Sequence, residues 1–192
     1  KISFYRNSVE DLNSQDYLLA DINVDICVIG GGLTGISTAL NLSKKGYSVV
    51  LCEARKIGWG ASGRNGGQLG IGMRKDQYTV EKMLGLSHAK ELWKLGLESV
   101  DEVKTLIKEY NINCHLVNGI MSSACFPKDI DEFKFELEYM SKNYNSDGYK
   151  FFNSSEIKNE INSDTYLAGL LDTYSYHLNP LKLTIGLAKI LQ

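Results

Sequence analysis

Three glycines and one acid point to the first chemistry in this chain. Gly30, Gly32 and Gly35 follow the apolar run 26–29, and Glu53 ends a second apolar run 18 residues beyond Gly35. Glycines at this spacing permit a tight turn and a close approach of the backbone to a pyrophosphate, and an acid about 20 residues further on can accept hydrogen bonds from a ribose. The spacing therefore predicts a dinucleotide site.

Such a site needs two strands and one helix in a fixed order. The sequence predicts a strand within 24–29, a helix over 33–45 that stops at Gly46, and a second strand over 47–52. The start of the helix would point backbone N–H groups at the phosphates. A strand–helix–strand unit without a ligand is the alternative reading.

Residues 55–73 form a second unusual segment. Glycine recurs there at positions 58, 60, 63, 66, 67, 70 and 72, a density that neither a helix nor a strand tolerates well. A flexible linker is one explanation, although linkers are rarely interleaved with residues such as Trp59, Arg64 and Leu69. The composition favours a backbone wrapped against a ligand.

The remaining elements are read from periodicity and from turn residues. A long helix is expected over 80–110, followed by a strand over 115–125 that breaks or turns as a hairpin at Asn118-Gly119. Further helices are expected from Pro127 to about 142 and over 154–161 with Ser154 as N-cap, and a strand over 166–171. A last helix begins with Asn179 as N-cap and Pro180 at its first position.

Composition sets broad limits on function. Hydrophobic residues make up 43% of the chain and charged residues 23%, as in soluble globular proteins. The net charge of −2 gives no case for a nucleic-acid partner, and no apolar run reaches the roughly 18 residues of a membrane span. The start of the chain lacks a secretory signal pattern, so a cytoplasmic location is expected. The four cysteines and three histidines show no metal-ligand spacing, and Cys27 and Cys52 are expected inside core strands as reduced thiols.

The glycine-rich loop also carries a family resemblance. The run 58–68, GWGASGRNGGQ, contains the Arg-x-Gly-Gly element Arg64-Asn-Gly66-Gly67 and resembles the FAD-dependent amino acid and amine oxidases, which include D-amino acid oxidase, glycine oxidase and sarcosine oxidase. It is most similar to the gamma-glutamylputrescine oxidoreductase group. The later run 177–181, HLNPL, is similar to a His-Leu-His-Pro-Leu element of that group, with Asn179 in place of the second histidine.

The resemblance implies an α/β fold, with a Rossmann-like FAD-binding domain of the GR2 flavoprotein type interleaved with an α+β substrate domain. It divides the chain into an N-terminal arm (1–23), a first FAD-domain segment (24–105), a substrate-domain segment (106–153) and a return to the FAD domain (154–192). Only two parallel strands are predicted, whereas a doubly wound domain needs several. We therefore expect an N-terminal half, with the other half supplied by a further segment or a separate chain.

The resemblance also assigns the cofactor site. Gly30, Gly32 and Gly35 would line the pyrophosphate, and Glu53 would bind the adenosine ribose. Arg64 would either contact a phosphate or pin the loop by a salt bridge. The expected FAD-binding residues are Gly30, Gly32, Leu33, Thr34, Gly35, Glu53, Ala54, Arg55, Gly60, Ala61, Ser62, Gly63, Arg64, Asn65, Gly66, Gly67, Gln68 and Leu69, of which 61–63 would meet the phosphate–ribityl region and 66–69 the isoalloxazine.

The reaction implied is the oxidation of a C–N bond in a small-molecule amine or amino acid. A hydride would pass to flavin N5, and the imine would hydrolyse. No catalytic side chain is identified, since such a site can work without a general base, and His177 is more easily read as a capping or packing residue. A non-catalytic FAD- or NAD-binding module and a nicotinamide-dependent dehydrogenase are the competing hypotheses.

Overall fold

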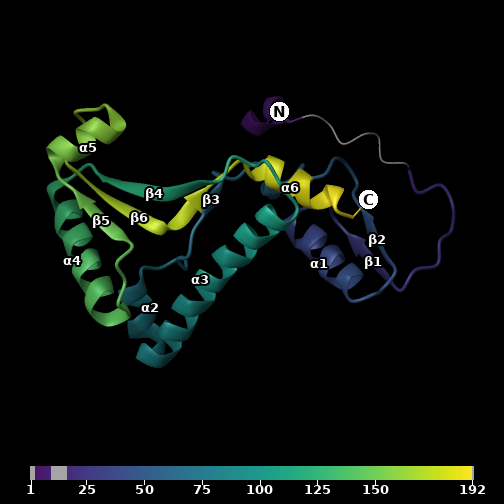
Figure 1. The fold of residues 1–192 in the computed structure, drawn as a ribbon, viewed down its shortest axis with the longest axis horizontal. Helices are drawn as coiled ribbons and strands as arrows, with labels where there is room; N and C mark the ends of the chain where they lie inside the picture. The colour runs from purple at the N-terminus through teal and green to yellow at the C-terminus, as the bar shows by residue number, and fades with distance from the viewer. Residues whose placement is uncertain (1–2, 10–16, 192) are drawn as a thin grey trace. The chain divides into compact units, whose positions relative to one another are not determined.

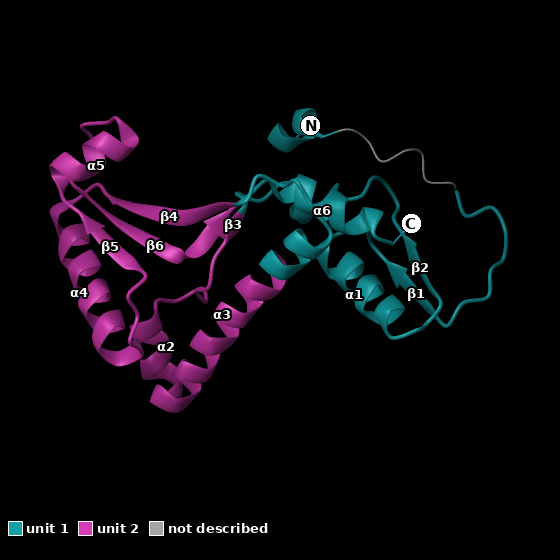
Figure 2. Cartoon of the chain, in the orientation of Figure 1, with its two compact units in different colours: residues 1–67, 104–116, 178–192 teal, residues 68–103, 117–177 magenta. Residues whose placement is uncertain are grey.

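The computed structural model describes residues 3–9 and 17–191. The chain forms two compact units, coloured separately in Figure 2. Unit 1 contains residues 1–67, 104–116 and 178–192, and unit 2 contains residues 68–103 and 117–177. Residues 154–177 thus belong to the same unit as 117–153. The division into cofactor and substrate domains expected from the sequence stays a prediction.

Unit 1 begins with the expected strand–helix–strand unit. Strand β1 (Ile26–Ile29) leads into helix α1 (Leu33–Lys44), and strand β2 (Val49–Cys52) pairs with β1 in parallel (Figure 1). Asp25 and Ser48 fasten the start of the two strands, because the Asp25 carboxylate accepts from both the backbone N–H and the hydroxyl of Ser48, at 2.8 and 2.6 Å. These hydrogen bonds lower the pKa of Asp25. The predicted order of elements is confirmed.

The core of unit 1 is completed by the last helix of the chain. Helix α6 (Pro180–Lys189) packs against α1 and buries Leu181, Leu183, Ile185 and Leu187. Asn179 is its N-cap, as predicted, because the side-chain Oδ1 accepts from the backbone N–H of Lys182 at 3.0 Å. Asn179, which stands where the similar family element has its second histidine, therefore provides an N-cap for α6.

The two strands of unit 1 are less buried than the sequence suggested. Ile29 is 87% exposed and Cys27 is exposed, so the prediction that Cys27 lies inside a core strand is wrong. The reason is that β1 and β2 form a two-stranded sheet against which α1 packs. Alternate side chains of β1 consequently point away from the packed layer.

Unit 2 is built on a four-stranded antiparallel sheet. Its long strand β6 (Ala168–His177) pairs with β4 (Val117–Ala124) on one side and with β3 (Gln68–Leu69) and β5 (Tyr149–Phe152) on the other. Helices α4 (Pro127–Tyr144) and α5 (Ser154–Ile161) pack against these strands (Figure 1). Helix α2 (Gln77–Leu84) and the part of α3 (Leu86–Glu109) up to residue 103 complete the unit.

Several predicted boundaries in this part of the chain are wrong. The long helix is two helices, because Gly85 adopts φ +81° and ψ 159°, which ends α2 before α3 begins. Strand β4 continues through Asn118-Gly119 with a shift in register in place of a hairpin. The N-cap of α5 is Asn153, whose side chain accepts from the backbone N–H groups of Ser155 and Glu156, and not Ser154. Strand β6 runs six residues beyond the predicted end at Leu171, since its partners lie on distant segments.

Two details concern the N-terminal arm and His115. Residues Phe4–Ser8 form a short 3-10 helix, η1, whose Ser8 hydroxyl accepts from Asn179 Nδ2 at 2.8 Å. Phe4 and Tyr17 are each 88% exposed. His115 precedes β4 with φ +54° and is not in a strand. Over residues 3–9 and 17–191, no helix is both long and apolar enough to cross a membrane.

Candidate functional site

The glycine turn of unit 1 lies between β1 and α1. Gly30 takes φ +110° and donates from its backbone N–H to the carbonyl of Cys52 at 2.8 Å. Gly35 lies in the first turn of α1, where an added Cβ would come within 2.0 Å of the Gly30 carbonyl oxygen. Only a glycine permits this approach, so helix and strand pack at the close distance that the motif predicted.

Glu53 closes the turn from the end of β2. Its Oε2 accepts from the backbone N–H of Gly31 at 2.6 Å, and its Oε1 accepts from the backbone N–H of Arg55 at 2.8 Å. A carboxylate has about four lone-pair positions, so two remain for further donors such as ribose hydroxyls. The structure thus shows that Glu53 stabilises the glycine turn, in addition to the ribose contact expected from the sequence.

The glycine-rich loop is fastened to the start of α1 by Ser62. Residues Ala61–Gly63 form the short 3-10 helix η2, and the Ser62 Oγ accepts from the backbone N–H of Leu33 at 2.9 Å. An added Cβ on Gly32 would lie 2.9 Å from the same Oγ. Because a hydroxyl that accepts can still donate, Ser62 keeps a proton for an anionic ligand at the helix end.

Arg64 pins the loop, but not by an ion pair within the part of the chain that the structure describes. Its Nε donates to the carbonyl of Trp59 at 2.6 Å, and its guanidinium carbon lies 4.9 Å from the centre of the Trp59 ring. The guanidinium carbon of Arg55 lies 5.4 Å from the same ring centre. Trp59 is therefore in cation–π contact with two arginines, which stiffens the loop where it is exposed.

Two contacts fix the far end of the loop. The side chain of Asn65 accepts from the backbone N–H of Gly67 at 2.8 Å, and the carbonyl of Gly67 accepts from the backbone N–H of Leu178 at 2.9 Å. Nearer the middle, the hydroxyl of Thr184 on α6 donates to the carbonyl of Ser62 at 3.4 Å. The loop is an ordered structure with contacts to three other segments, not a linker.

The predicted site residues within unit 1 come together at one end of its sheet. Leu33, Thr34 and Gly35 start α1, Ala54 and Arg55 follow β2, and the loop 60–67 is joined to both by the contacts above. Gln68 and Leu69 form β3 of unit 2, where Gln68 pairs with His177. Their approach to a flavin stays a prediction, as do the roles of the individual residues.

Three contributors were missed from the sequence. Gly31 supplies the N–H that Glu53 holds, and the run of three consecutive glycines was the available signal. Trp59 lies in cation–π contact with Arg55 and Arg64, and its position between these two arginines in the sequence could have suggested those contacts. Thr184 gave no signal, because its contact with Ser62 joins residues 122 positions apart.

The arrangement fits FAD. A pyrophosphate needs a helix start without side-chain bulk, and glycines occupy 30–32 and 35 there. Thr34, Gly60 and Ala61 are exposed beside it, so an extended ligand can reach the backbone. The Ser62 hydroxyl retains a proton that fits a phosphate oxygen, and the Glu53 carboxylate retains acceptor positions that fit a ribose.

Comparisons with known proteins agree with this fit. Residues 25–192 match the DAO family, FAD dependent oxidoreductase. The chain is 36% identical over 184 residues to gamma-glutamylputrescine oxidoreductase of Escherichia coli, covering 96% of this chain and 43% of that protein. It is equally identical over 184 residues to the probable oxidoreductase OrdL of Haemophilus influenzae, with 93% and 42% covered. The chain thus spans about two fifths of the length of these relatives.

Solved structures show the same fold at lower identity. L-amino acid deaminase from Proteus vulgaris matches with a TM-score of 0.67 at 20% identity, over 95% of this chain and 40% of that one. Glycine oxidase from Bacillus cereus matches with a TM-score of 0.64 at 17% identity, over 88% and 45%. The Rossmann-like α/β fold class and FAD as the cofactor, both expected from the sequence, are confirmed. This chain belongs to the FAD dependent oxidoreductase family.

Proposed function

We propose that the chain supplies the cofactor-binding part of an enzyme that oxidises the C–N bond of an amine or amino acid, for example an amine similar to gamma-glutamylputrescine. The observation that carries the proposal is the hydrogen bond between Ser62 and the first turn of α1, because it joins the glycine turn and the Arg-x-Gly-Gly loop into one ligand-sized surface. The substrate class is supported by the similarity to gamma-glutamylputrescine oxidoreductase, L-amino acid deaminase and glycine oxidase.

A few residues around the glycine turn and the glycine-rich loop would hold the cofactor. The backbone N–H groups at the start of α1 and the hydroxyl of Ser62 would bind the pyrophosphate. Glu53 would accept from the adenosine ribose while it holds Gly31. Arg64 would keep the loop in place through Trp59, and its remaining N–H groups would face phosphate oxygens.

The chemistry that FAD would supply is oxidation of a C–N bond, in which a hydride would leave the carbon beside a neutral amine for flavin N5. Water would then hydrolyse the resulting imine to an aldehyde or keto acid, with release of ammonia or an amine. This chain's contribution is to bind and orient the cofactor, and no side chain here is assigned as an acid or base. We propose unit 2 as the first part of the substrate domain. Residues 1–192 alone are expected to show weak or absent amine oxidation, because they span about two fifths of the relatives' length.

The test uses the natural polypeptide purified from its cells. We expect a yellow protein with flavin absorbance bands that produces hydrogen peroxide, or reduces a dye, with one member of an amine and amino acid panel. A colourless protein that takes up no FAD on reconstitution would refute the cofactor assignment. A yellow protein that oxidises nothing in the panel would favour a non-catalytic flavin-binding module.

A further inference from the structure

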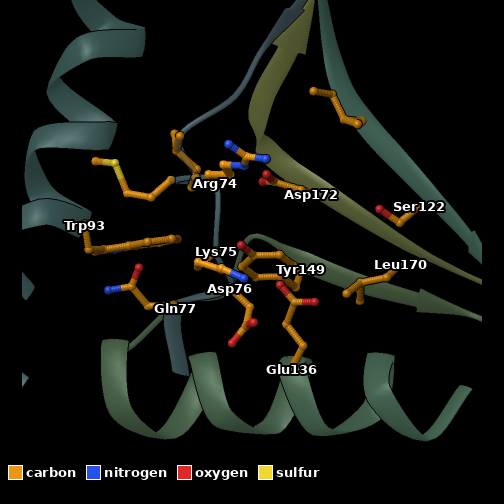
Figure 3. Close-up of a pocket in the computed structure, with 14 residues that line it drawn as sticks. Arg74, Lys75, Asp76, Gln77, Trp93, Ser122, Glu136, Tyr149, Leu170 and Asp172 are labelled. Atoms are coloured by element: carbon orange, nitrogen blue, oxygen red, sulfur yellow. The ribbon is translucent and has the colours of Figure 1, made fainter. Parts of the chain in front are cut away.

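Each unit contains a cavity at which segments far apart in the chain meet. The cavity of unit 2 measures about 260 Å³ and is lined by Arg74, Trp93, Glu136 and Asp172, among others (Figure 3). It lies in the part of the chain proposed as the start of the substrate domain. A cavity of unit 1 measures about 180 Å³, and its wall joins the N-terminal arm to the glycine-rich loop. The arm thus packs against the segment that is expected to bind FAD.

The wall of the unit 1 cavity contains side chains from three segments. Ser3 and Arg6 line it from the arm, Trp59 and Arg64 line it from the glycine-rich loop, and Leu181 lines it from α6. Trp59 and Arg64 are the cation–π pair that stiffens the loop. The arm therefore lies beside the part of the loop whose conformation this pair fixes.

The first fastening of the arm is at the short helix η2. The Ser3 hydroxyl donates to the carbonyl of the buried Gly63 at 3.4 Å, a long and therefore weak hydrogen bond. The preceding residue, Ser62, is held by the backbone N–H of Leu33 and by the hydroxyl of Thr184. One turn of the loop is thus held from the arm, from α1 and from α6.

The second fastening of the arm is at the start of α6. The Ser8 hydroxyl accepts from Asn179 Nδ2 at 2.8 Å and donates to the carbonyl of Tyr5 at 2.6 Å. Asn179 caps α6, and the residue before it, Leu178, donates from its backbone N–H to the carbonyl of Gly67. The arm is thereby tied to the segment that fixes the far end of the loop. Figure 1 shows this part of the arm in purple, at the label N.

The arm is held lightly. None of the residues Phe4–Ser8 is buried, Phe4 is 88% exposed, and the hydrogen bond between Ser8 and Asn179 lies only partly out of solvent. A segment with few buried contacts and accessible hydrogen bonds opens at a small cost in free energy compared with global unfolding. The arm can therefore leave the loop while unit 1 stays folded.

We propose that residues 3–9 of the arm form a strap that retains FAD. When the strap is fastened, it holds the turn Ala61–Gly63 in place before the cofactor binds, so binding has less conformational entropy to overcome. When it opens, the loop is free to move and FAD can leave. Ser3 and Ser8 are positioning residues, because they act through the loop and through Asn179. The inference rests on the proposed cofactor site, but it does not require that any amine is oxidised.

The test is the rate at which FAD leaves the natural polypeptide, followed by the recovery of flavin fluorescence after dilution. A variant whose chain begins at Tyr17 should release FAD about tenfold faster, and Ser8→Ala about fivefold faster, because a neutral hydrogen bond is lost. Ser8→Thr keeps a hydroxyl and should restore slow release. The rate of FAD uptake by each apoprotein should change little, since affinity differences between closely related complexes lie mostly in dissociation.

The matched control is Ser48→Ala, which removes the hydroxyl that donates to Asp25 at the start of β1 and β2, away from the glycine turn. It should release FAD as the unchanged protein does. The proposal is overturned if the variant that begins at Tyr17 releases FAD at the unchanged rate, or if Ser8→Thr releases it as fast as Ser8→Ala.

Equally fast release from Ser48→Ala and Ser8→Ala would also overturn the proposal, because a general loss of stability would then account for both. Failure of the oxidation proposal looks different. A protein that oxidises no amine, while the expected release rates are found, refutes the oxidation and leaves the strap supported.

Discussion

The Oγ of Ser62 accepts a hydrogen bond from the backbone N–H of Leu33 at 2.9 Å and so joins the glycine-rich loop to the first turn of α1. The two residues are 29 positions apart, and each belongs to a different motif of the sequence. The bond satisfies one of the N–H groups that every helix start leaves open, while the Ser62 proton remains to donate. One side chain therefore joins the two segments of the proposed site and keeps a donor for the proposed ligand.

The variant Ser62→Ala is expected to bind FAD about tenfold more weakly, because it loses a donor to a phosphate oxygen and the tie that places the loop. The measurement is quenching of FAD fluorescence during reconstitution of the apoprotein. Ser43→Ala, on the exposed side of α1, is the matched control and should bind FAD as the unchanged protein does. Equal affinity of the two variants would remove Ser62 from the site.

Replacement of Gly35 by alanine tests the close packing of helix and strand. The added Cβ would come within 2.0 Å of the Gly30 carbonyl oxygen, and we expect a loss of about 2–4 kcal/mol in the free energy of unfolding. Urea titration measures it. Gly72→Ala, where an added Cβ meets no atom within 4 Å, should change stability by only about 0.5 kcal/mol. Similar unfolding midpoints for the two variants would show that the turn can relax.

Asn179 links the N-cap of α6 to the arm of the chain. Asn179→Ala removes the acceptor for Lys182 N–H and the donor to Ser8, and should cost about 1–2 kcal/mol of unfolding free energy. Asn179→Asp keeps the cap acceptor and should recover most of this loss. If aspartate is as damaging as alanine in the same urea titration, the cap contributes little, and the contact with Ser8 is the more important one.

Glu136 should make stability depend on pH. Its folded-state pKa is raised above the ordinary value of 4.5, so the folded protein binds this proton more tightly than the unfolded chain does. Stability from this group is present at low pH and falls as pH rises through 4.5 to the folded pKa. We therefore expect Glu136→Gln to be more stable than the unchanged protein at pH 7, with little difference at pH 4.

The check is urea unfolding at both pH values, with Glu138→Gln as the control that should shift neither. A Glu136→Gln variant that is destabilised at pH 7 would mean that the carboxylate has a cationic partner in the unliganded protein.

Local pattern was sufficient for much of this protein. Gly30, Gly32, Gly35 and Glu53 predicted a strand, a turn, a helix and a second strand, all of which are found in that order. The Asn179-Pro180 pair predicted the start of α6 to the residue. These features depend on backbone conformation and on contacts between near neighbours, and such information is carried by a short stretch of sequence. The run Gly58–Gln68 carried the resemblance to the FAD-dependent oxidases, and the family match over residues 25–192 confirms it.

Long-range contacts decided the rest. The end of β6 at His177 depends on partners near residues 68 and 117, which lie far from it in the sequence. The tie between Ser62 and Leu33, the contact of Thr184 with the loop, and the meeting of Glu136 with Arg74 around one cavity all join segments far apart in the chain. The sequence by itself determined which cofactor this chain is built for. Which side chains share its cavities was decided only by the tertiary structure, because packing brings together residues whose separation along the chain carries no periodic signal.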